Sequence, residues 1–347
     1  MFRLAQYPSY QVFIGVVLAL VACAALFPFW IRLLKFRNIG QQVRADGPQG
    51  HLVKQGTPTM GGVLILLVVT AVYLLFGNFG RSSVLALATM ISCGILGFFD
   101  DWSKVAHERS LGLTPRAKIA GQAAVALLFG VLAVNWAGIS PLVTLPLVPG
   151  SLDLGVLTSS ITLGKTLIVI PWLYLGLVFF MVVGESNAVN LTDGLDGLAA
   201  GTVTIVMLAY AGIAFRQNRL DIALLAASVA GACIGFIWYN SYPADIFMGD
   251  TGSLGLGAGI AALAVITKTE LLVLLIGGIY LAEALSVVLQ VASFKLTGKR
   301  IFRMAPIHHH FEMIGWSETK IMVRFWIITG ITAGAGFALF FVSSVRR

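Results

Sequence analysis

The segment 10–33 has the sequence YQVFIGVVLALVACAALFPFWIRL, in which Arg32 is the single charged residue. A helix needs about 20 consecutive apolar residues to cross the hydrocarbon core of a bilayer. This segment is long enough to do so and too long for the apolar part of a signal peptide, so we interpret it as a retained membrane span. The chain contains nine more segments of this kind, at approximately residues 61–77, 82–99, 118–136, 167–184, 197–215, 220–238, 253–267, 271–293 and 322–344.

The composition supports the same interpretation. The 347 residues are 58% hydrophobic and only 11% charged, whereas soluble domains carry roughly 25% charged residues. The apolar residues form long blocks, not the alternating segments of about 10 residues that a membrane β-barrel needs. The sequence therefore predicts an all-α integral membrane protein, a single domain over residues 1–347 with about ten transmembrane helices. The three cysteines all fall in predicted spans, so neither a disulfide framework nor a cysteine metal site is expected.

Lysine and arginine residues are distributed unequally between the two ends of the predicted bundle. The loops 34–60, 100–117 and 294–321, with the adjoining span ends, hold 15 of the 23. Loops rich in these residues face the cytoplasm, so we expect these loops to be cytoplasmic and, with an even number of spans, both termini to be periplasmic. The net charge of +8 suits anionic lipid headgroups and phosphorylated substrates, and nucleic acid is not expected as a partner.

Two segments depart from plain apolar spans. The connection 137–166 combines prolines with an alternating apolar pattern, which predicts a small hairpin or a re-entrant piece. The ninth span contains Gly277, Gly278 and Glu283, so a bent helix, or one that faces protein, is expected there. Glu283 is also the one acidic residue expected inside a span, because the other carboxylates fall near the span ends or in loops.

The pair Asp100-Asp101 ends the third span, and most of the acidic residues share its side of the membrane. Adjacent carboxylates repel one another, and a divalent cation or a raised pKa is the usual resolution. Neighbouring helical side chains point about 100° apart, so one carboxylate can hold a metal ion while the other faces substrate. The alternative is a solvated helix end without chemical function.

Polar residues recur at every third position of the segment 187–198, as Asn187, Asn190, Asp193 and Asp196. Amides and carboxylates at such a helix break can bind a ribose or a base through directional hydrogen bonds. The alternative is an Asp-Gly turn with caps for the sixth span, but such a turn needs one residue of this kind, not four.

A third motif runs from Phe247 to Ser253 and contains Gly249 and Asp250; Asn240 precedes it. Thr251 or Ser253 is expected to cap the eighth span, with Asp250 beside the free N–H groups of a helix N-terminus, which favour phosphate. The alternative is that Asp250 only complements the helix dipole.

The segment 54–62 contains Lys54, Thr59 and two glycines just before the second span. Glycines let the backbone approach a ligand closely, and lysine with hydroxyl groups can bind a nucleotide or a phosphate; a flexible loop is the alternative. Lys118 opens the fourth span opposite Asp100. It can pair with a phosphate, or serve as a structural lysine at the membrane surface.

Three consecutive histidines, His308, His309 and His310, lie in the last predicted cytoplasmic loop. They lack the i, i+4 spacing of a helical zinc site, and no cysteine accompanies them. An imidazolium beside a pyrophosphate can stabilise its charge, whereas a loop without chemical function is the alternative. All five motifs are expected at one membrane face.

Taken together, the five motifs resemble those of the phospho-N-acetylmuramoyl-pentapeptide transferase (MraY) family, within the polyprenyl-phosphate N-acetylhexosamine-1-phosphate transferase superfamily. They occur in the family's order, so the resemblance covers essentially the whole chain. Trp102 and Gly255 depart from the tyrosine and alanine more usual in the family, but neither replaces a reacting group. The matching stretches are KQGTPTMGG (54–62), FFDD (98–101), NAVNLTDGLDGLA (187–199), FMGDTGS (247–253) and PIHHHFE (306–312).

The resemblance implies transfer of phospho-MurNAc-pentapeptide from UDP-MurNAc-pentapeptide to undecaprenyl phosphate, giving lipid I and UMP, with Mg2+. It also implies a homodimer in the bacterial cytoplasmic membrane and a lipid groove beside a bent ninth helix. Asp250 would bind Mg2+ with Asp100 and Asp101 near it, and Asp100 is the expected base. The other catalytic residues implied are Lys118, Asn190, Asp193, His308, His309 and His310. The substrate-binding candidates are Lys54, Thr59, Asn187, Gly194, Leu195, Asp196, Asn240, Phe247, Gly249 and Ser253, with Phe247 stacking on uracil.

Two other functions remain open from the sequence. A related transferase that uses UDP-GlcNAc would share the carboxylates. A transporter would also hold charged residues in helices, but near the middle of the membrane, where only Glu283 is expected.

Overall fold

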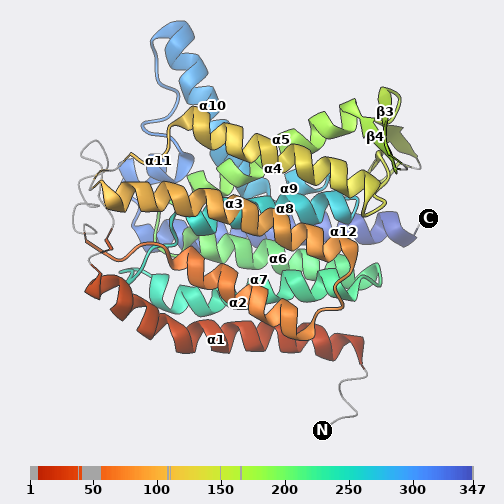
Figure 1. Ribbon diagram of the computed structural model, residues 1–347. Helices are drawn as coiled ribbons and strands as arrows, with labels where there is room; N and C mark the ends of the chain where they lie inside the picture. The colour runs from red at the N-terminus through yellow and green to blue at the C-terminus, as the bar shows by residue number, and fades with distance from the viewer. Residues whose placement is uncertain are drawn as a thin grey trace.

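The computed structural model describes residues 7–345 except 38, 41–55, 108, 110, 149 and 165. Most of this part of the chain is helical (Figure 1). The helices are α1 (Pro8–Phe36), α2 (Gly61–Phe76), α3 (Arg81–Ala106), α4 (Pro115–Asn135), α5 (Trp172–Thr192), α6 (Leu198–Arg216), α7 (Leu220–Asn240), α8 (Gly249–Ile266), α9 (Val273–Ile276), α10 (Gly278–Thr297), α11 (Ile307–Met313) and α12 (Glu318–Val345). The strands are β1 (Leu142–Thr144), β2 (Ser151–Asp153), β3 (Thr158–Leu163) and β4 (Thr166–Pro171).

Among the described residues, nine helices are long and apolar enough to cross a membrane. They correspond to nine of the ten expected spans. The exception is α2, which has 16 residues and a length of about 24 Å at 1.5 Å per residue. Its bounds agree with the expected segment 61–77 to within one residue, and it ends where the chain leaves the helical conformation at Gly77, whose backbone is extended.

Helix α8 is the centre of the bundle. Its residues from Thr251 to Ile266 are all buried, and α2, α3, α5 and α6 pack around it. Small residues recur along α8, and small side chains let membrane helices approach closely. The central helix is therefore held from several sides at its N-terminal end, where Asp250 lies.

The connection between α4 and α5 forms two hairpins. Strands β1 and β2 pair antiparallel, and so do β3 and β4. The predicted hairpin is confirmed, with a second one added. Figure 1 shows β3, β4, the start of α1 and the end of α12 on the right of the bundle, and α11 on the left. The start of α1 and the end of α12 thus lie at the same end of the bundle.

The ninth span is broken, as predicted. Helix α9 ends at Ile276, and α10 begins at Gly278 in a new direction. Figure 1 shows the C-terminal part of α10 rising away from the other helices. The side chains of α10 that face inward include Glu283, which is fully buried. One expectation was wrong: Glu185 also lies within a span, seven residues before the end of α5, so Glu283 is not the only acidic residue there.

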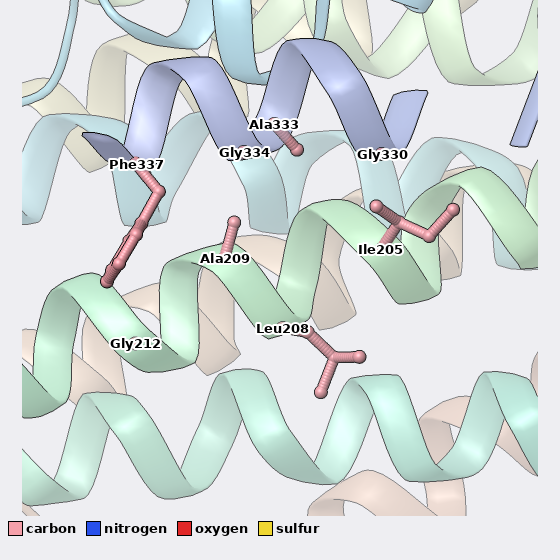
Figure 2. A pocket seen from close by; sticks show the side chains of 8 residues that line it. All are labelled: Ile205, Leu208, Ala209, Gly212, Gly330, Ala333, Gly334 and Phe337. Carbon is pink, nitrogen blue, oxygen red and sulfur yellow. The ribbon is translucent and has the colours of Figure 1, made fainter. Parts of the chain in front are cut away.

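A groove of about 280 Å³ separates α6 from α12 (Figure 2). The ring of Phe337 reaches across it toward Gly212 (Figure 2). The lining offers only hydrocarbon and backbone, so the groove has no group that can bind a phosphate. Its lining residues are Ile205, Leu208, Ala209, Gly212, Gly330, Ala333, Gly334 and Phe337.

Candidate active site

Asp101 is bound to the N-terminus of α8. Its two carboxylate oxygens accept the backbone N–H groups of Asp250 (3.0 Å) and Thr251 (2.9 Å), and the Thr251 hydroxyl donates at 2.7 Å. The first N–H groups of a helix have no partner within the helix, and here a carboxylate from α3 supplies it. The expectation that Thr251 or Ser253 caps α8 is therefore wrong. The helix begins at Gly249 without a side-chain cap of its own.

Asp100 points away from Asp101, as neighbouring positions on a helix require. The backbone N–H of Leu113 donates to its Oδ1 at 2.8 Å, and the Lys104 ammonium lies 2.6 Å from its Oδ2. Only 1% of Asp100 is exposed and 3% of Asp101. Both carboxylates are thus held in place by the loop before α4, by α8 and by the lysine, so a solvated helix end does not describe them.

Asp250 is the meeting point of four elements. Its Oδ2 lies 2.5 Å from the Lys118 ammonium and 3.1 Å from that of Lys104. The Asn190 amide donates to its Oδ1 at 2.8 Å and to the Ser253 hydroxyl at 2.8 Å. Helices α3, α4 and α5 therefore each contribute one polar group to this carboxylate, which α8 carries.

The three aspartates can hold a metal ion. One oxygen from each of Asp100, Asp101 and Asp250 lies within 4.8 Å of the other two. Carboxylate oxygens are the ligands that hard divalent cations prefer. Two ammonium groups offset part of the negative charge of the cluster, so the donor set and its local charge both suit a divalent cation.

Lys104 is the residue of this cluster that the sequence analysis did not select. It stands one turn after Asp100 and bridges Asp100, Asp101 at 3.7 Å and Asp250. The i, i+4 spacing of Asp100 and Lys104 was visible in the sequence and indicates a pair on one helix face. In the sequence, however, Lys104 is one of many lysines and arginines on the predicted cytoplasmic side, and the excess of positive charge there is explained by membrane orientation alone.

Gly249 joins the N-terminus of α8 to its surroundings. Its φ of +76° belongs to the left-handed region, which L residues seldom adopt. A Cβ at this position would lie 2.6 Å from Asp101 Oδ2 and 3.2 Å from the Thr59 hydroxyl. The close packing of α8 against α3 and the segment before α2 therefore depends on the absence of a side chain.

The loop between α5 and α6 carries Asp193 and Gly194. Asp193 is partly buried, and burial together with the nearby Asp250 and Asp101 carboxylates raises its pKa well above the usual range. A Cβ at Gly194 would lie 2.3 Å from His308 Nε2. The histidine motif of α11 thus lies directly on this loop, although more than a hundred residues separate them in the sequence.

The loop is supported by a buried framework made of its own residues Leu195 and Asp196 and of Asn240, the last residue of α7. Asp196 accepts the Ala244 N–H at 2.9 Å, while its own N–H donates to Glu318 at 2.8 Å. The Asn240 amide accepts the Gly197 N–H at 3.0 Å and donates to the Ile246 carbonyl at 2.8 Å. These side chains tie the loop 193–197 to the segment 243–248, and Glu318 is a further part of that framework.

Phe247 stands beside the cluster with its ring partly buried. Its backbone N–H donates to the Pro58 carbonyl at 2.8 Å, and its carbonyl accepts the Gly61 N–H at 2.9 Å. The start of α2 and the segment before α8 are thus joined, which brings the described part of the motif 54–62 together with the motif 247–253. Lys54 falls outside the described residues.

Three further predicted site residues form hydrogen bonds with partners outside the carboxylate cluster. Asn187 donates to Gln122 of α4 at 2.9 Å. His309 pairs with Glu312 at 2.5 Å, and His310 accepts the Arg303 N–H at 3.1 Å. His308 is the histidine whose ring lies against Gly194, in the loop of Asp193.

Residues 83–268 match the model of the glycosyl transferase family 4, and residues 54–66 match signature 1 of the phospho-N-acetylmuramoyl-pentapeptide-transferases. Phospho-N-acetylmuramoyl-pentapeptide-transferases of Frankia casuarinae and Mycobacterium tuberculosis are each 45% identical to this chain, over 95% of it and 97% of their own length. The chain belongs to the phospho-N-acetylmuramoyl-pentapeptide-transferase family.

The matched regions coincide with the site. The glycosyl transferase model extends from α3 to the residues just after α8 and so includes all three aspartates, both lysines and Asn190. The signature of the phospho-N-acetylmuramoyl-pentapeptide-transferases includes Pro58 and Gly61, which bind the backbone of Phe247. The family assignment and the carboxylate cluster therefore concern the same part of the molecule.

Proposed function

We propose that this protein transfers phospho-MurNAc-pentapeptide from UDP-MurNAc-pentapeptide to undecaprenyl phosphate, producing lipid I and UMP. The observation that carries the proposal is the cluster of Asp100, Asp101 and Asp250 bridged by two lysines. Family membership narrows the chemistry, because the relatives are named for this transfer. The groups present are those that phosphoryl transfer needs, since it depends mainly on positioning and charge stabilisation.

Mg2+ is the cofactor that fits the three carboxylates. When bound, it would neutralise charge on the phosphates during transfer. Asp250 would hold it with Asp100 and Asp101, and Asn190 fixes the orientation of the Asp250 carboxylate. Lys104 and Lys118 already lie at the carboxylates, so they stand where the diphosphate oxygens would need positive charge.

The position of the cluster at the end of the spanning helices suits the two substrates. The hydrocarbon tail of the acceptor remains in the bilayer because each buried CH2 contributes about 0.8 kcal/mol, whereas the donor is soluble. The two substrates can therefore meet only at a membrane surface. The loops at the cluster's end of the bundle have an excess of positive residues, which favours the cytoplasmic surface. Two further parts of the proposal are a homodimer, which the mass of the detergent-solubilised protein checks, and location in the bacterial cytoplasmic membrane.

Direct displacement is the mechanism that we favour. A phosphate monoester has a second pKa of about 6, so the acceptor is already largely dianionic at neutral pH. Asp100 then has to orient the acceptor and to remove a proton from a minor fraction of it. The rival mechanism is a covalent aspartyl intermediate.

The test of the proposed function is a comparison of donors. Purified protein in lipid with undecaprenyl phosphate and Mg2+ is offered UDP-MurNAc-pentapeptide or UDP-GlcNAc, and UMP release is measured. We expect release with the first donor and not with the second. Release with UDP-GlcNAc alone would identify the related N-acetylglucosamine transferase, and nucleotide-dependent flux across the membrane without UMP release would identify a transporter.

A further inference from the structure

Glu283 and His308 form a pair that lies wholly inside the protein. The imidazole Nδ1 is 3.0 Å from Glu283 Oε1, and both side chains are 0% exposed. Glu283 belongs to the membrane-spanning helix α10, and His308 to the short helix α11. A buried carboxylate without a partner costs several kcal/mol, so the contact accounts for the presence of an acid within α10.

The second nitrogen of the same ring faces the active-site loop. His308 Nε2 is buried and has no hydrogen-bond partner among the described residues. It lies against Gly194, where a Cβ would be only 2.3 Å away. Gly194 follows Asp193, whose carboxylate is close enough to Asp250 and Asp101 for their charges to influence it.

From this geometry we infer that Glu283 is a positioning residue for the proposed transfer. By accepting a hydrogen bond from Nδ1–H, it fixes the tautomer and the orientation of His308, so that Nε2 is the atom directed at the substrate phosphates. In the protonated ring Nε2–H donates a hydrogen bond to a phosphate oxygen, and the Glu283 carboxylate stabilises that charge from the other side. An imidazole whose second nitrogen is held by a carboxylate is a known way to fix ring orientation and proton position.

The inference rests on the proposed function, but its first measurement does not need turnover. The chain has five histidines, and 15N NMR of histidine-labelled protein in lipid bilayers distinguishes protonated from unprotonated ring nitrogens. The signal of His308 is assigned by its loss in His308→Gln. We expect Nδ1 of His308 to carry a proton in the unmodified protein. A neutral ring protonated only on Nε2 would overturn the inference, whatever the kinetics.

Kinetics of two Glu283 variants provide the second measurement. Loss of a residue that orients a ligand-contacting histidine typically costs about 10- to 100-fold. We expect Glu283→Ala to lower kcat by that factor with little change in KM for the donor, and to give His308 a mixture of tautomers. In Glu283→Gln the amide oxygen can still accept a hydrogen bond from Nδ1–H. The tautomer should therefore be kept, and kcat should fall less than in Glu283→Ala.

Ser286→Ala is the matched control. Ser286 is buried in the same helix and donates to the Glu283 carbonyl at 2.7 Å, and among the described residues it forms no hydrogen bond with His308. Its kcat and the His308 signal should both stay unchanged. Equal losses of kcat in Ser286→Ala and Glu283→Gln would mean that α10 is merely disturbed, and would overturn the inference. Absence of UMP release from the unmodified protein would instead contradict the proposed function, while the NMR result would stand by itself.

Discussion

At the scale of single residues, Asp250 is the carboxylate on which polar groups from three other helices converge. It receives Lys104, Lys118 and Asn190 and completes the three-carboxylate cluster. We expect Asp250→Ala to lower UMP release by more than about 10³-fold, because the loss of metal binding removes several kcal/mol of charge stabilisation. Asp153→Asn, in the β1–β2 hairpin, is the control and should behave as the unmodified protein. Ordinary Mg2+-dependent rates in Asp250→Ala would contradict the assigned role.

Asp100 has a different expected signature. If it removes a proton from only a minor fraction of the acceptor, Asp100→Asn should retain some activity, and that activity should rise with pH. The sign follows from the acceptor: above its second pKa of about 6 it is dianionic, and less of it needs a base. The kcat measured from pH 6 to pH 9 checks this. Trapping a phospho-MurNAc adduct on the enzyme would show that a covalent intermediate forms instead.

We expect Lys104 to contribute to the transfer as the aspartates do, because it bridges all three carboxylates. A hydrogen bond to a charged group contributes about 1.5–3 kcal/mol, so Lys104→Gln should lower kcat/KM about 10- to 100-fold. Lys35→Gln removes a lysine from the last turn of α1 and serves as the control. Equal activities of the two variants would mean that Lys104 only contributes to the positive charge of its loop.

At the scale of elements, the start of α8 requires glycine at 249 for two reasons, the left-handed backbone and the lack of space for a side chain. Gly298 shares only the first of these and so separates the two effects. Both have a φ near +70°, but a Cβ at Gly298 would meet nothing within 4 Å, whereas one at Gly249 would meet Asp101. Each Gly→Ala change should cost about 1 kcal/mol of backbone strain, measured as a lower thermal midpoint. Only Gly249→Ala should also lose activity, because its methyl group displaces Asp101 from the α8 N-terminus. Full activity in Gly249→Ala would contradict the packing argument.

At the scale of the whole molecule, orientation in the membrane is the property to test. Figure 1 shows the start of α1 and the end of α12 at the end of the bundle opposite α11. The excess of positive residues predicts that the α11 end is cytoplasmic. A fusion of alkaline phosphatase to the C-terminus should therefore be active, whereas a fusion of the same enzyme within the loop 298–306 should be inactive. The reverse pattern would place the carboxylate cluster away from its soluble donor.

The sequence by itself determined the helical membrane class, nine of the expected spans, the hairpin connection and the break near Gly277. These properties depend on local composition and spacing, because bilayer thickness sets the length of a span and glycine permits a break. Residue type alone also indicated which side chains are candidates for binding and catalysis. The aspartates, Lys118, Asn190 and His308 were selected because carboxylates, amides and imidazoles are unusual in a chain of this hydrophobicity.

Only the tertiary structure decided what each of these groups touches. The contact between Asp101 and Thr251 joins residues 150 positions apart, and the pair of Glu283 and His308 joins two helices that no periodicity relates. The amide of Asn240 is engaged at both ends by backbone, which its residue type cannot reveal. Side-chain partners depend on how helices pack in three dimensions, and one sequence records the charge and size of each residue but not the distance between two that are far apart along the chain.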